Sequence, residues 1–336
     1  MRVINKFTDF LLLNANSVNS IGLYNGKAGI SLCLFELAQY INDETLEELA
    51  FELLQEILAL SSRNEKINFE GGLSGVGFVL LYLIQNQKID ADYGELFGEQ
   101  NHKIISRLQE QKDYSIKDLA FVIFLELLAN STNEEVINIL IDRILIGAGE
   151  LLSKKLKIIN SIDSGVVKLR VLNDLDSYLK MLVLCRKSPR TELINRYAEL
   201  YEKGKVASRF STGYYLEKLV LDENIRNTAQ TIKENAVQNM HPDSLTLSQS
   251  INLLYLLNQE NHCYQKQIEL LEQDLFDFDN PDYEKNMIRL IRNQGLFAGY
   301  SSGITRLLLY WIYRENKRNG LDCSRFKYIF NSISYE

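Results

Sequence analysis

Apolar residues recur at spacings of three and four along almost the whole chain, a period typical of amphipathic helices. Between Leu46 and Leu58 the apolar residues cover one helix face, and the glutamates of this segment lie largely off that face. Residues 30–37 and 77–83, by contrast, are apolar nearly all round, which predicts helices that are buried on several sides. No convincing run of alternating β-branched residues ends in a hairpin turn. The pattern therefore predicts an all-α fold.

The two kinds of helix alternate along the chain. Buried helices are expected to begin near Gly26, Gly72, Lys117, Asn173, Ser211, Leu245 and Gly299, and amphipathic helices near Asp43, Tyr93, Glu134, Pro189, Asp222, Tyr264 and Cys323. A spacing of roughly 35 to 55 residues between buried helices is typical of helical-hairpin repeats. Such hairpins either stack into an open solenoid or close into a toroid. Closure is favoured, because an open array would leave some apolar helices in water. We predict one α/α toroid domain over residues 1–336, with about seven hairpins, an inner ring of apolar helices and an outer ring of amphipathic helices.

Short glycine-rich segments precede three of the buried helices. They read Gly22-Leu-Tyr-Asn-Gly26-Lys-Ala-Gly29-Ile30, Gly71-Gly72-Leu-Ser-Gly75-Val76-Gly77-Phe78 and Gly295-Leu-Phe-Ala-Gly299-Tyr-Ser-Ser-Gly303-Ile304. Glycine in a helix costs about 0.5–1 kcal/mol relative to alanine, so its repeated use needs a reason. One reason is crowding, since helix starts without Cβ atoms can converge. The other is that free N–H groups face a central cavity and bind an anion or a carbonyl. The glycines given a structural role are Gly22, Gly26, Gly29, Gly72, Gly75, Gly295, Gly299 and Gly303.

Composition and charge exclude several classes of protein. The chain of 336 residues has only 3 prolines, which fits long uninterrupted helices. Its formal net charge is −7, and it has no basic block of the kind that nucleic-acid binding requires. The 4 cysteines are far apart and form no CxxC pair. The apolar runs are too short to span a bilayer, which takes about 20 residues, and no signal peptide is recognisable. We therefore expect a cytoplasmic protein without a transmembrane segment.

The order and spacing of the glycine segments resemble those of the lanthionine synthetase C-like family. Gly22–Ile30 is similar to the first inner-helix motif of that family, Gly71–Phe78 to the second and Gly295–Ile304 to the last. The resemblance implies an α/α toroid and a role in ribosomal peptide modification of the lantibiotic type. It also implies a zinc ion that activates a peptide cysteine thiol for addition to dehydroalanine or dehydrobutyrine. Three protein ligands, a cysteine and a Cys-His pair, would leave the fourth zinc position open for that thiol.

The zinc ligands that the resemblance implies are absent from their expected positions. Phe210 and Ser211 stand where the family has Trp-Cys, and Thr246 and Leu247 stand where it has Cys-His. These side chains bind zinc poorly. The third and fourth motifs have also lost their usual residues, and the fourth aligns loosely at Asn173. We therefore expect no metal and no other cofactor, and we assign no catalytic residue. The chain's histidines are His102, His241 and His262.

One other pair of residues could ligate a metal. His262 and Cys263 are adjacent, but such a pair needs further ligands from elsewhere in the chain. Cys263 is also placed at the start of an amphipathic helix, away from the expected cavity. An ordinary, partly buried cysteine is the simpler interpretation.

Polar and aromatic residues at the starts of the inner helices are the candidates for lining a central cavity. Lys27 and Glu70 could act as base and acid if they were desolvated, or they could be ordinary residues in solvent. Aromatic residues such as Phe210 could form a peptide-binding wall, or they could fill the core. The cavity-lining candidates are Lys27, Glu70, Ser74, Ser211, Thr246, Tyr300 and Ser301.

Three functions remain open at this stage. The first is a lanthionine synthetase C-like pseudoenzyme that binds a precursor peptide, or a peptide-modifying enzyme such as a dehydratase, without zinc chemistry of its own. The second is an active thioether-forming cyclase that uses other residues or a partner. The third is a carbohydrate-active α/α toroid, which would need two carboxylates across a cleft; only Glu70 and Asp174 or Asp176 are available for that role.

Overall fold

The computed structural model describes residues 2–132, 134–158, 167–219, 222–260, 263–278, 280–291 and 298–332. Within these ranges the chain forms sixteen α-helices and two short 3-10 helices, and no strand occurs there. The all-α prediction is confirmed. None of the helices in the described ranges is long and apolar enough to cross a membrane.

The helices fall into two compact units, each described here by itself. Unit 1 comprises Met1–Glu110 and Ser244–Phe330, and unit 2 comprises Gln111–Asp243 and Asn331–Glu336. The helices of unit 1 are α1 (Arg2–Ala15), α2 (Lys27–Ile41), α3 (Glu44–Ser61), α4 (Leu73–Gln85), α5 (Tyr93–Glu110), α12 (Leu247–Leu257), α13 (Gln265–Phe276), α14 (Tyr283–Ile291), α15 (Ile304–Arg318) and α16 (Phe326–Asn331). Those of unit 2 are α6 (Leu119–Thr132), α7 (Glu135–Ile158), α8 (Leu169–Leu184), α9 (Thr191–Glu202), α10 (Phe210–Lys218) and α11 (Glu223–Gln238).

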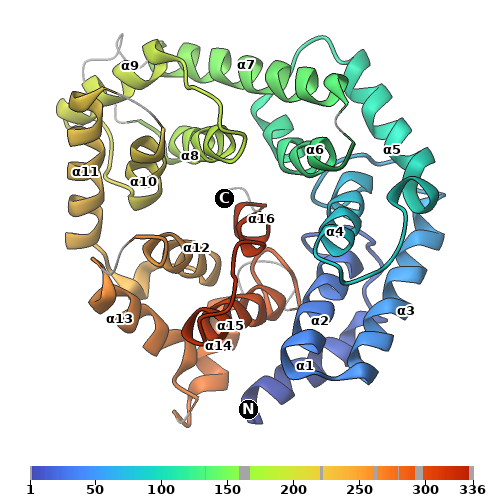
Figure 1. Ribbon diagram of the computed structural model, residues 1–336. Coiled ribbons are helices and arrows are strands. Elements are labelled where there is room, and N and C mark those ends of the chain that lie inside the picture. The colour runs from blue at the N-terminus through green and yellow to red at the C-terminus, as the bar shows by residue number, and fades with distance from the viewer. Residues whose placement is uncertain are drawn as a thin grey trace. The chain divides into compact units, whose positions relative to one another are not determined.

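Unit 1 contains the first, second, sixth and seventh of the predicted buried helices. Every residue of α2 from Lys27 to Ala38 is buried, and so is every residue of α4 from Leu73 to Leu83. In α3, by contrast, the buried positions follow a single face. Helix α2 packs against α3, α4 and α15 (Figure 1), so segments from opposite ends of the chain share one core. The alternation of buried and amphipathic helices is thus present as predicted.

Helix α3 shows how the sequence sets the helix boundaries. Helix α2 ends at Asn42, which adopts a left-handed conformation with φ of 55°. Asp43 then caps α3, because its side chain accepts a hydrogen bond from the Leu46 N–H at 3.0 Å. Glu44 and Glu47 lie in the first turn, where negative charge is stabilised by the helix dipole. These residues explain why the predicted start near Asp43 is accurate.

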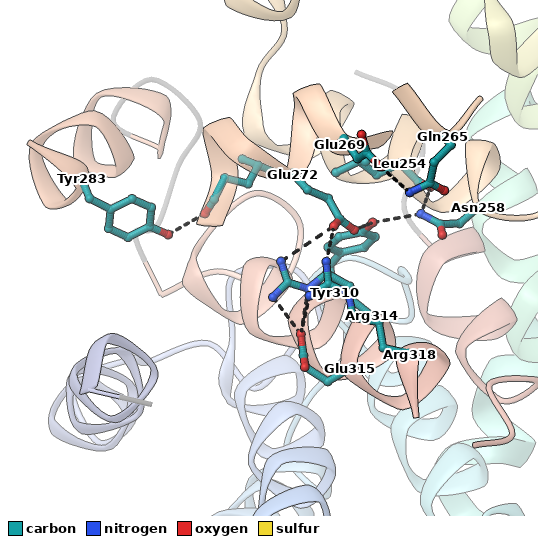
Figure 2. A network of polar contacts seen from close by, with 11 residues as sticks. Leu254, Asn258, Gln265, Glu269, Glu272, Tyr283, Tyr310, Arg314, Glu315 and Arg318 are labelled. Atoms are coloured by element: carbon teal, nitrogen blue, oxygen red, sulfur yellow. Dashed lines mark hydrogen bonds and ion pairs between the residues drawn. The ribbon is translucent and has the colours of Figure 1, made fainter. Parts of the chain in front are cut away.

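A network of polar contacts connects α13 to α15 (Figure 2). Glu272 on α13 accepts hydrogen bonds from the Tyr310 hydroxyl at 3.0 Å and from Arg318 Nη2 at 2.9 Å. Arg314 is ion-paired with Glu315 one position along the same helix at 2.7 Å. An amphipathic helix is therefore held against a buried one by charged contacts as well as by apolar packing.

Unit 2 repeats the same arrangement with α6, α8 and α10 as its buried helices. Helix α10 packs against α8 and α11. Gly213 on α10 allows a close approach, since a Cβ there would lie 2.7 Å from the carbonyl oxygen of Ala229 on α11. Asp222 caps α11 by accepting a hydrogen bond from Ile225 N–H at 2.9 Å.

The structure differs from the predicted boundaries in several places. Helix α8 begins at Leu169, before the predicted Asn173, and α15 begins at Ile304, after the predicted Gly299. Helix α1 was not predicted, although Ile4, Phe7 and Leu11 form its buried face. It packs against α2 and α15, outside the alternating pattern from which the other helices were inferred. Helix α14 was not predicted either.

Candidate functional site

The loops that lead into α2, α4 and α15 are joined by backbone hydrogen bonds inside unit 1. The N–H of Tyr24 donates to the carbonyl of Glu70 at 2.9 Å. The carbonyl of Tyr24 accepts from the N–H of Tyr300 at 2.7 Å and from that of Ser301 at 3.3 Å. The first glycine segment therefore lies between the second and the last, and three helix starts meet at one place.

The glycines stand where a side chain has no room. A Cβ on Gly22 would lie 2.6 Å from the backbone carbon of Gly71 and 2.7 Å from the carbonyl oxygen of Glu70. A Cβ on Gly29 would lie 2.5 Å from the Cβ of Tyr300. Carbon atoms in contact are normally about 3.5–4.0 Å apart. Crowding of the helix starts is sufficient to explain both glycines.

Three further glycines of these segments fit the same explanation. A Cβ on Gly26 would lie 2.6 Å from the nitrogen of Gly22, and one on Gly72 would lie 2.8 Å from the carbonyl oxygen of Asn68. A Cβ on Gly75 would lie 2.9 Å from the Cβ of Leu23. Gly299 and Gly303 close the turn before α15, where the Gly303 N–H donates to the Gly299 carbonyl at 2.9 Å. Gly295 lies outside the described residues.

The first N–H groups of these helices are already used by the protein. At α2, the N–H of Lys27 donates to the Ser20 carbonyl at 2.9 Å, and that of Ala28 donates to the Ile21 carbonyl at 3.3 Å. At α4, the N–H of Leu73 donates to the Lys66 carbonyl at 2.9 Å. The hypothesis that free N–H groups bind an anion therefore has no support at α2 or α4, since these donors have intramolecular partners.

The charged candidates of unit 1 do not form an acid–base pair. Lys27 is buried, contrary to the alternative that placed it in solvent, and its ammonium group is ion-paired with Glu56 of α3. Glu70 has an exposed side chain. The structure thus gives Lys27 a structural partner on the neighbouring amphipathic helix.

The hydroxyl candidates of unit 1 also have defined surroundings. The Ser74 hydroxyl is buried and donates to the carbonyl of Ile67. Tyr300 is fully buried, and its hydroxyl donates to the carbonyl of Ile329 at 3.1 Å. Ser301 is partly exposed.

The sixth helix start uses its two candidate ligand positions for structure. Thr246 is the N-cap of α12, and its hydroxyl oxygen accepts from the Gln249 N–H at 3.3 Å. The Gln249 side chain accepts in turn from the Thr246 N–H at 3.0 Å, which completes a capping box. Leu247 is fully buried. A cap and a core leucine therefore occupy the positions at which the resemblance implies a Cys-His pair.

Unit 2 contains a buried carboxylate that the sequence offered only as a candidate for the glycosidase alternative. Asp176 on α8 is fully buried. It accepts hydrogen bonds from the hydroxyls of Ser211, at 2.7 Å, and Thr212. Its Oδ2 is also 3.1 Å from Nη1 of Arg209. Three residues at the start of α10 thus provide the partners of one buried carboxylate.

The contacts of this cluster stabilise the fold, and they do not supply an activated nucleophile with a base beside it. The Ser211 side chain is buried and its proton is directed to Asp176, so its oxygen is held by a charge-assisted hydrogen bond. Burial, together with the nearby charge of Asp176, raises the pKa of the Tyr197 hydroxyl well above its ordinary value. Tyr197 is therefore a neutral phenol in this setting and supplies no base.

The carboxylate of Asp174, two positions before Asp176, also has a charged partner. Asp174 is 2.7 Å from the ammonium group of Lys155 on α7. Neither Asp174 nor Asp176 is a free carboxylate in unit 2, and the structure therefore gives no support to the glycosidase alternative from this pair.

The residues present do not fit a zinc ion of the kind that the resemblance implies. Among the described residues, no group of three or more histidine, cysteine, aspartate and glutamate side chains could hold a metal ion. Cys33 is buried, and burial raises the pKa of its thiol, which disfavours the thiolate that zinc requires. Cys263 is exposed, while His262 lies outside the described residues. We derive no zinc chemistry for the chain, and the absence of a cofactor stays a prediction.

Comparison with known proteins relates these helix starts to a family. Residues 17–146 match the model described as lanthionine synthetase C-like protein, and this range contains the first two glycine segments. This part of the chain is therefore similar to lanthionine synthetase C-like proteins. No curated protein sequence matches it significantly.

A solved structure extends the similarity to the whole chain. The chain is similar to nisin cyclase over 98% of its own length and 98% of that protein's length, with a TM-score of 0.62 and 15% sequence identity. This similarity confirms the predicted fold class, an all-α α/α toroid. The single domain over residues 1–336 and the lining of a common cavity stay predictions.

Proposed function

We propose that this chain acts in ribosomal peptide modification of the lanthipeptide type as a zinc-free member of its family. In this proposal it binds a precursor peptide or a peptide-modifying enzyme such as a dehydratase, in the cytoplasm, and does not itself form thioether rings. The family match over residues 17–146 and the fold of nisin cyclase support the biological setting.

One observation carries the non-catalytic part of the proposal. Each of the three positions that correspond to zinc ligands has a structural contact instead. The Ser211 hydroxyl donates to Asp176, the Thr246 oxygen caps α12, and Leu247 is packed in the core. A side chain engaged in this way offers neither a thiolate nor an imidazole to a metal.

The first experiment measures zinc in the purified, full-length chain. Elemental analysis is expected to find far less than one zinc per chain, and treatment with a chelator is expected to leave the folded state unchanged. One tightly held zinc per chain would support the cyclase alternative. The variant Cys263→Ser then serves as a control, because it removes zinc held at the adjacent His-Cys pair and leaves zinc held elsewhere.

The second experiment tests catalysis directly with a dehydrated precursor peptide. Ring formation adds a thiol S–H across a C=C bond, so it consumes free thiols without changing the peptide mass. Alkylation after incubation is expected to label as many cysteines as in a buffer control. A loss of labelled cysteines that depends on the chain would refute the non-catalytic assignment. Failure of the chain to co-purify with either the precursor peptide or a dehydratase from a neighbouring gene would refute the partner-binding assignment.

A further inference from the structure

We propose that a groove on unit 1, between α3 and residues 88–96, binds a basic amphipathic peptide segment. This inference rests on the proposed function in one respect, that a peptide is the partner. It goes further by naming the surface and the chemistry of the peptide. The groove is distinct from the glycine-rich helix starts, since the residues that line it come from other parts of α2 and α3 and from the start of α5.

The groove has the size and apolar floor of a peptide site. Its volume is about 640 Å³, within the range of small-ligand pockets. A second hollow of about 170 Å³ adjoins it and shares Phe35, Glu44, Glu47 and Lys88 with it. Besides Phe35, the apolar residues of the larger hollow are Phe51, Leu54, Leu58, Ile89, Ala91 and Leu96.

Two of these apolar side chains are exposed at the groove. Phe51 on α3 is 44% exposed and Leu96 on α5 is 38% exposed, while Leu54 beside them is buried. Large apolar side chains grouped around a hollow mark an interaction surface more strongly than single exposed ones do. The groove can therefore accept apolar side chains of a partner.

The rim of the groove is acidic. Glu44, Glu47 and Glu48 on α3 and Asp90 on the loop before α5 line it, and all four are exposed. Within the described part of the chain, no salt bridge engages any of these four carboxylates. The helix dipole accounts for Glu44 and Glu47 in the first turn of α3, but it does not account for Glu48 or Asp90.

The one lysine of the groove does not neutralise this rim. The ammonium group of Lys88 is 3.3 Å from Glu36, and its side chain is only 4% exposed. Lys88 also donates to the side chain of Gln39. Glu36 lies beneath, fully buried, and is paired with Arg325 at 3.0 Å. The positive charge of Lys88 is thus directed mainly to the buried Glu36, and its electrostatic interaction with Glu47 at the rim is weaker. The four rim carboxylates therefore face a single lysine that is already paired.

An amphipathic helix with a basic face satisfies both features of the groove. Its apolar side chains, spaced at i, i+3, i+4 and i+7, would enter the floor, as in other complexes that place a helix in a groove. Its lysines or arginines would face the four rim carboxylates. Such charge complementarity speeds association and disfavours the binding of acidic peptides. An acidic peptide would meet like charges at the rim, so it is excluded on the same grounds.

The test uses a synthetic peptide of about four helical turns with leucines on one face and lysines on the other. A matched peptide has glutamates in place of the lysines. Binding to the full-length chain is measured by fluorescence anisotropy at low and at physiological salt. We expect the lysine peptide to bind with Kd below ~1 mM, and the glutamate peptide to bind at least about ten-fold more weakly.

Variants of the chain distinguish binding at the groove from non-specific attraction of a basic peptide to an acidic protein. The rim variant carries Glu44→Gln, Glu47→Gln and Glu48→Gln. The charge-matched control carries three exposed glutamates of unit 2 changed in the same way, namely Glu134→Gln, Glu202→Gln and Glu223→Gln. We expect the rim variant to bind the lysine peptide roughly 5- to 50-fold more weakly than the control does.

A second pair of variants tests the apolar floor. Phe51→Ser should weaken binding by roughly ten-fold or more, whereas Leu13→Ser, at a residue that is 80% exposed on α1, should leave binding unchanged. All variants alter exposed residues, and far-ultraviolet circular dichroism checks their folding. Equal weakening in the rim variant and its control, equal binding of the two peptides, or no binding up to ~1 mM would overturn the groove assignment. None of these outcomes depends on zinc content or on precursor processing, so the proposed function is tested separately.

Discussion

The crowding of the helix starts predicts opposite effects for one substitution at two glycines. Gly29 lies in α2 and Gly98 lies in α5, both inside helices. Alanine improves helix propensity by about 0.5–1 kcal/mol at either position. At Gly98 a Cβ meets nothing within 4 Å. Gly98→Ala is therefore expected to stabilise the protein by about 0.5–1 kcal/mol.

At Gly29 a steric clash outweighs the gain in helix propensity, so the same substitution is expected to lower the stability of the protein. The new Cβ would lie 2.5 Å from the Cβ of Tyr300, so the two must separate by about 1 Å to reach normal contact. Tyr300 is fully buried, and its N–H is bonded to the Tyr24 carbonyl at 2.7 Å, which leaves it little room to move. Overpacking costs about 1–3 kcal/mol, and the fixed position of Tyr300 places the cost in the upper part of that range, about 2–3 kcal/mol. After the gain in helix propensity, Gly29→Ala should destabilise the protein by about 1–2 kcal/mol.

Urea unfolding followed by circular dichroism measures both effects. The two variants should move the unfolding midpoint in opposite directions, with free energies that differ by roughly 2–3 kcal/mol. A Gly29→Ala protein as stable as the parent chain would refute the inference that the glycines are there because the helix starts collide. If Gly98→Ala destabilised the protein, the inference that a Cβ at this position of α5 meets no neighbour would be wrong.

Other measurements test individual contacts. Asp176→Asn should cost about 1.5–3 kcal/mol in urea unfolding, because it removes the charge that Ser211 and Arg209 contact; a neutral effect would contradict the cluster. Glu36→Gln should cost roughly 3–5 kcal/mol, since it leaves the buried ends of two cations without their carboxylate, and a loss under about 1 kcal/mol would argue against that pairing. Thr246→Ala should lose about 0.5–2 kcal/mol of stability while Thr246→Ser retains it, as expected of an N-cap. Burial raises the pKa of the Cys33 thiol, so less thiolate forms at a given pH, and a thiol reagent should leave Cys33 unlabelled in the native protein even at about pH 9; rapid labelling there would contradict its burial.

The fold was largely predictable because two physical signals run along the sequence. Helices that are apolar all round and helices that are apolar on one face are distinguished by pattern alone, and their alternation gave the starts of α2, α3, α4 and α5 within one or two residues. Glycines marked the crowded loops before α2 and α4. Helices α1 and α14 were missed because neither has a glycine segment or a place in the alternation.

The contacts of the candidate site were less predictable. The sequence places Lys27 at a helix start but does not show that Glu56, on the next helix, faces it. In the same way the sequence shows Asp176 as one of two acids in α8, but it does not show the contacts with Ser211 and Thr212, which join residues about 35 positions apart. A charged residue on the buried face of a helix is the signal that could have identified it, because buried carboxylates need partners.

The central proposal is that the chain, which has the fold of nisin cyclase, holds no zinc at the positions where the family resemblance implies ligands. Elemental analysis of the purified chain, after dialysis against buffer with zinc and then without it, tests this most directly. The structural contacts of Ser211, Thr246 and Leu247 predict a zinc content near zero per chain. Retention of one zinc per chain, unaffected by Cys263→Ser, would contradict the claim.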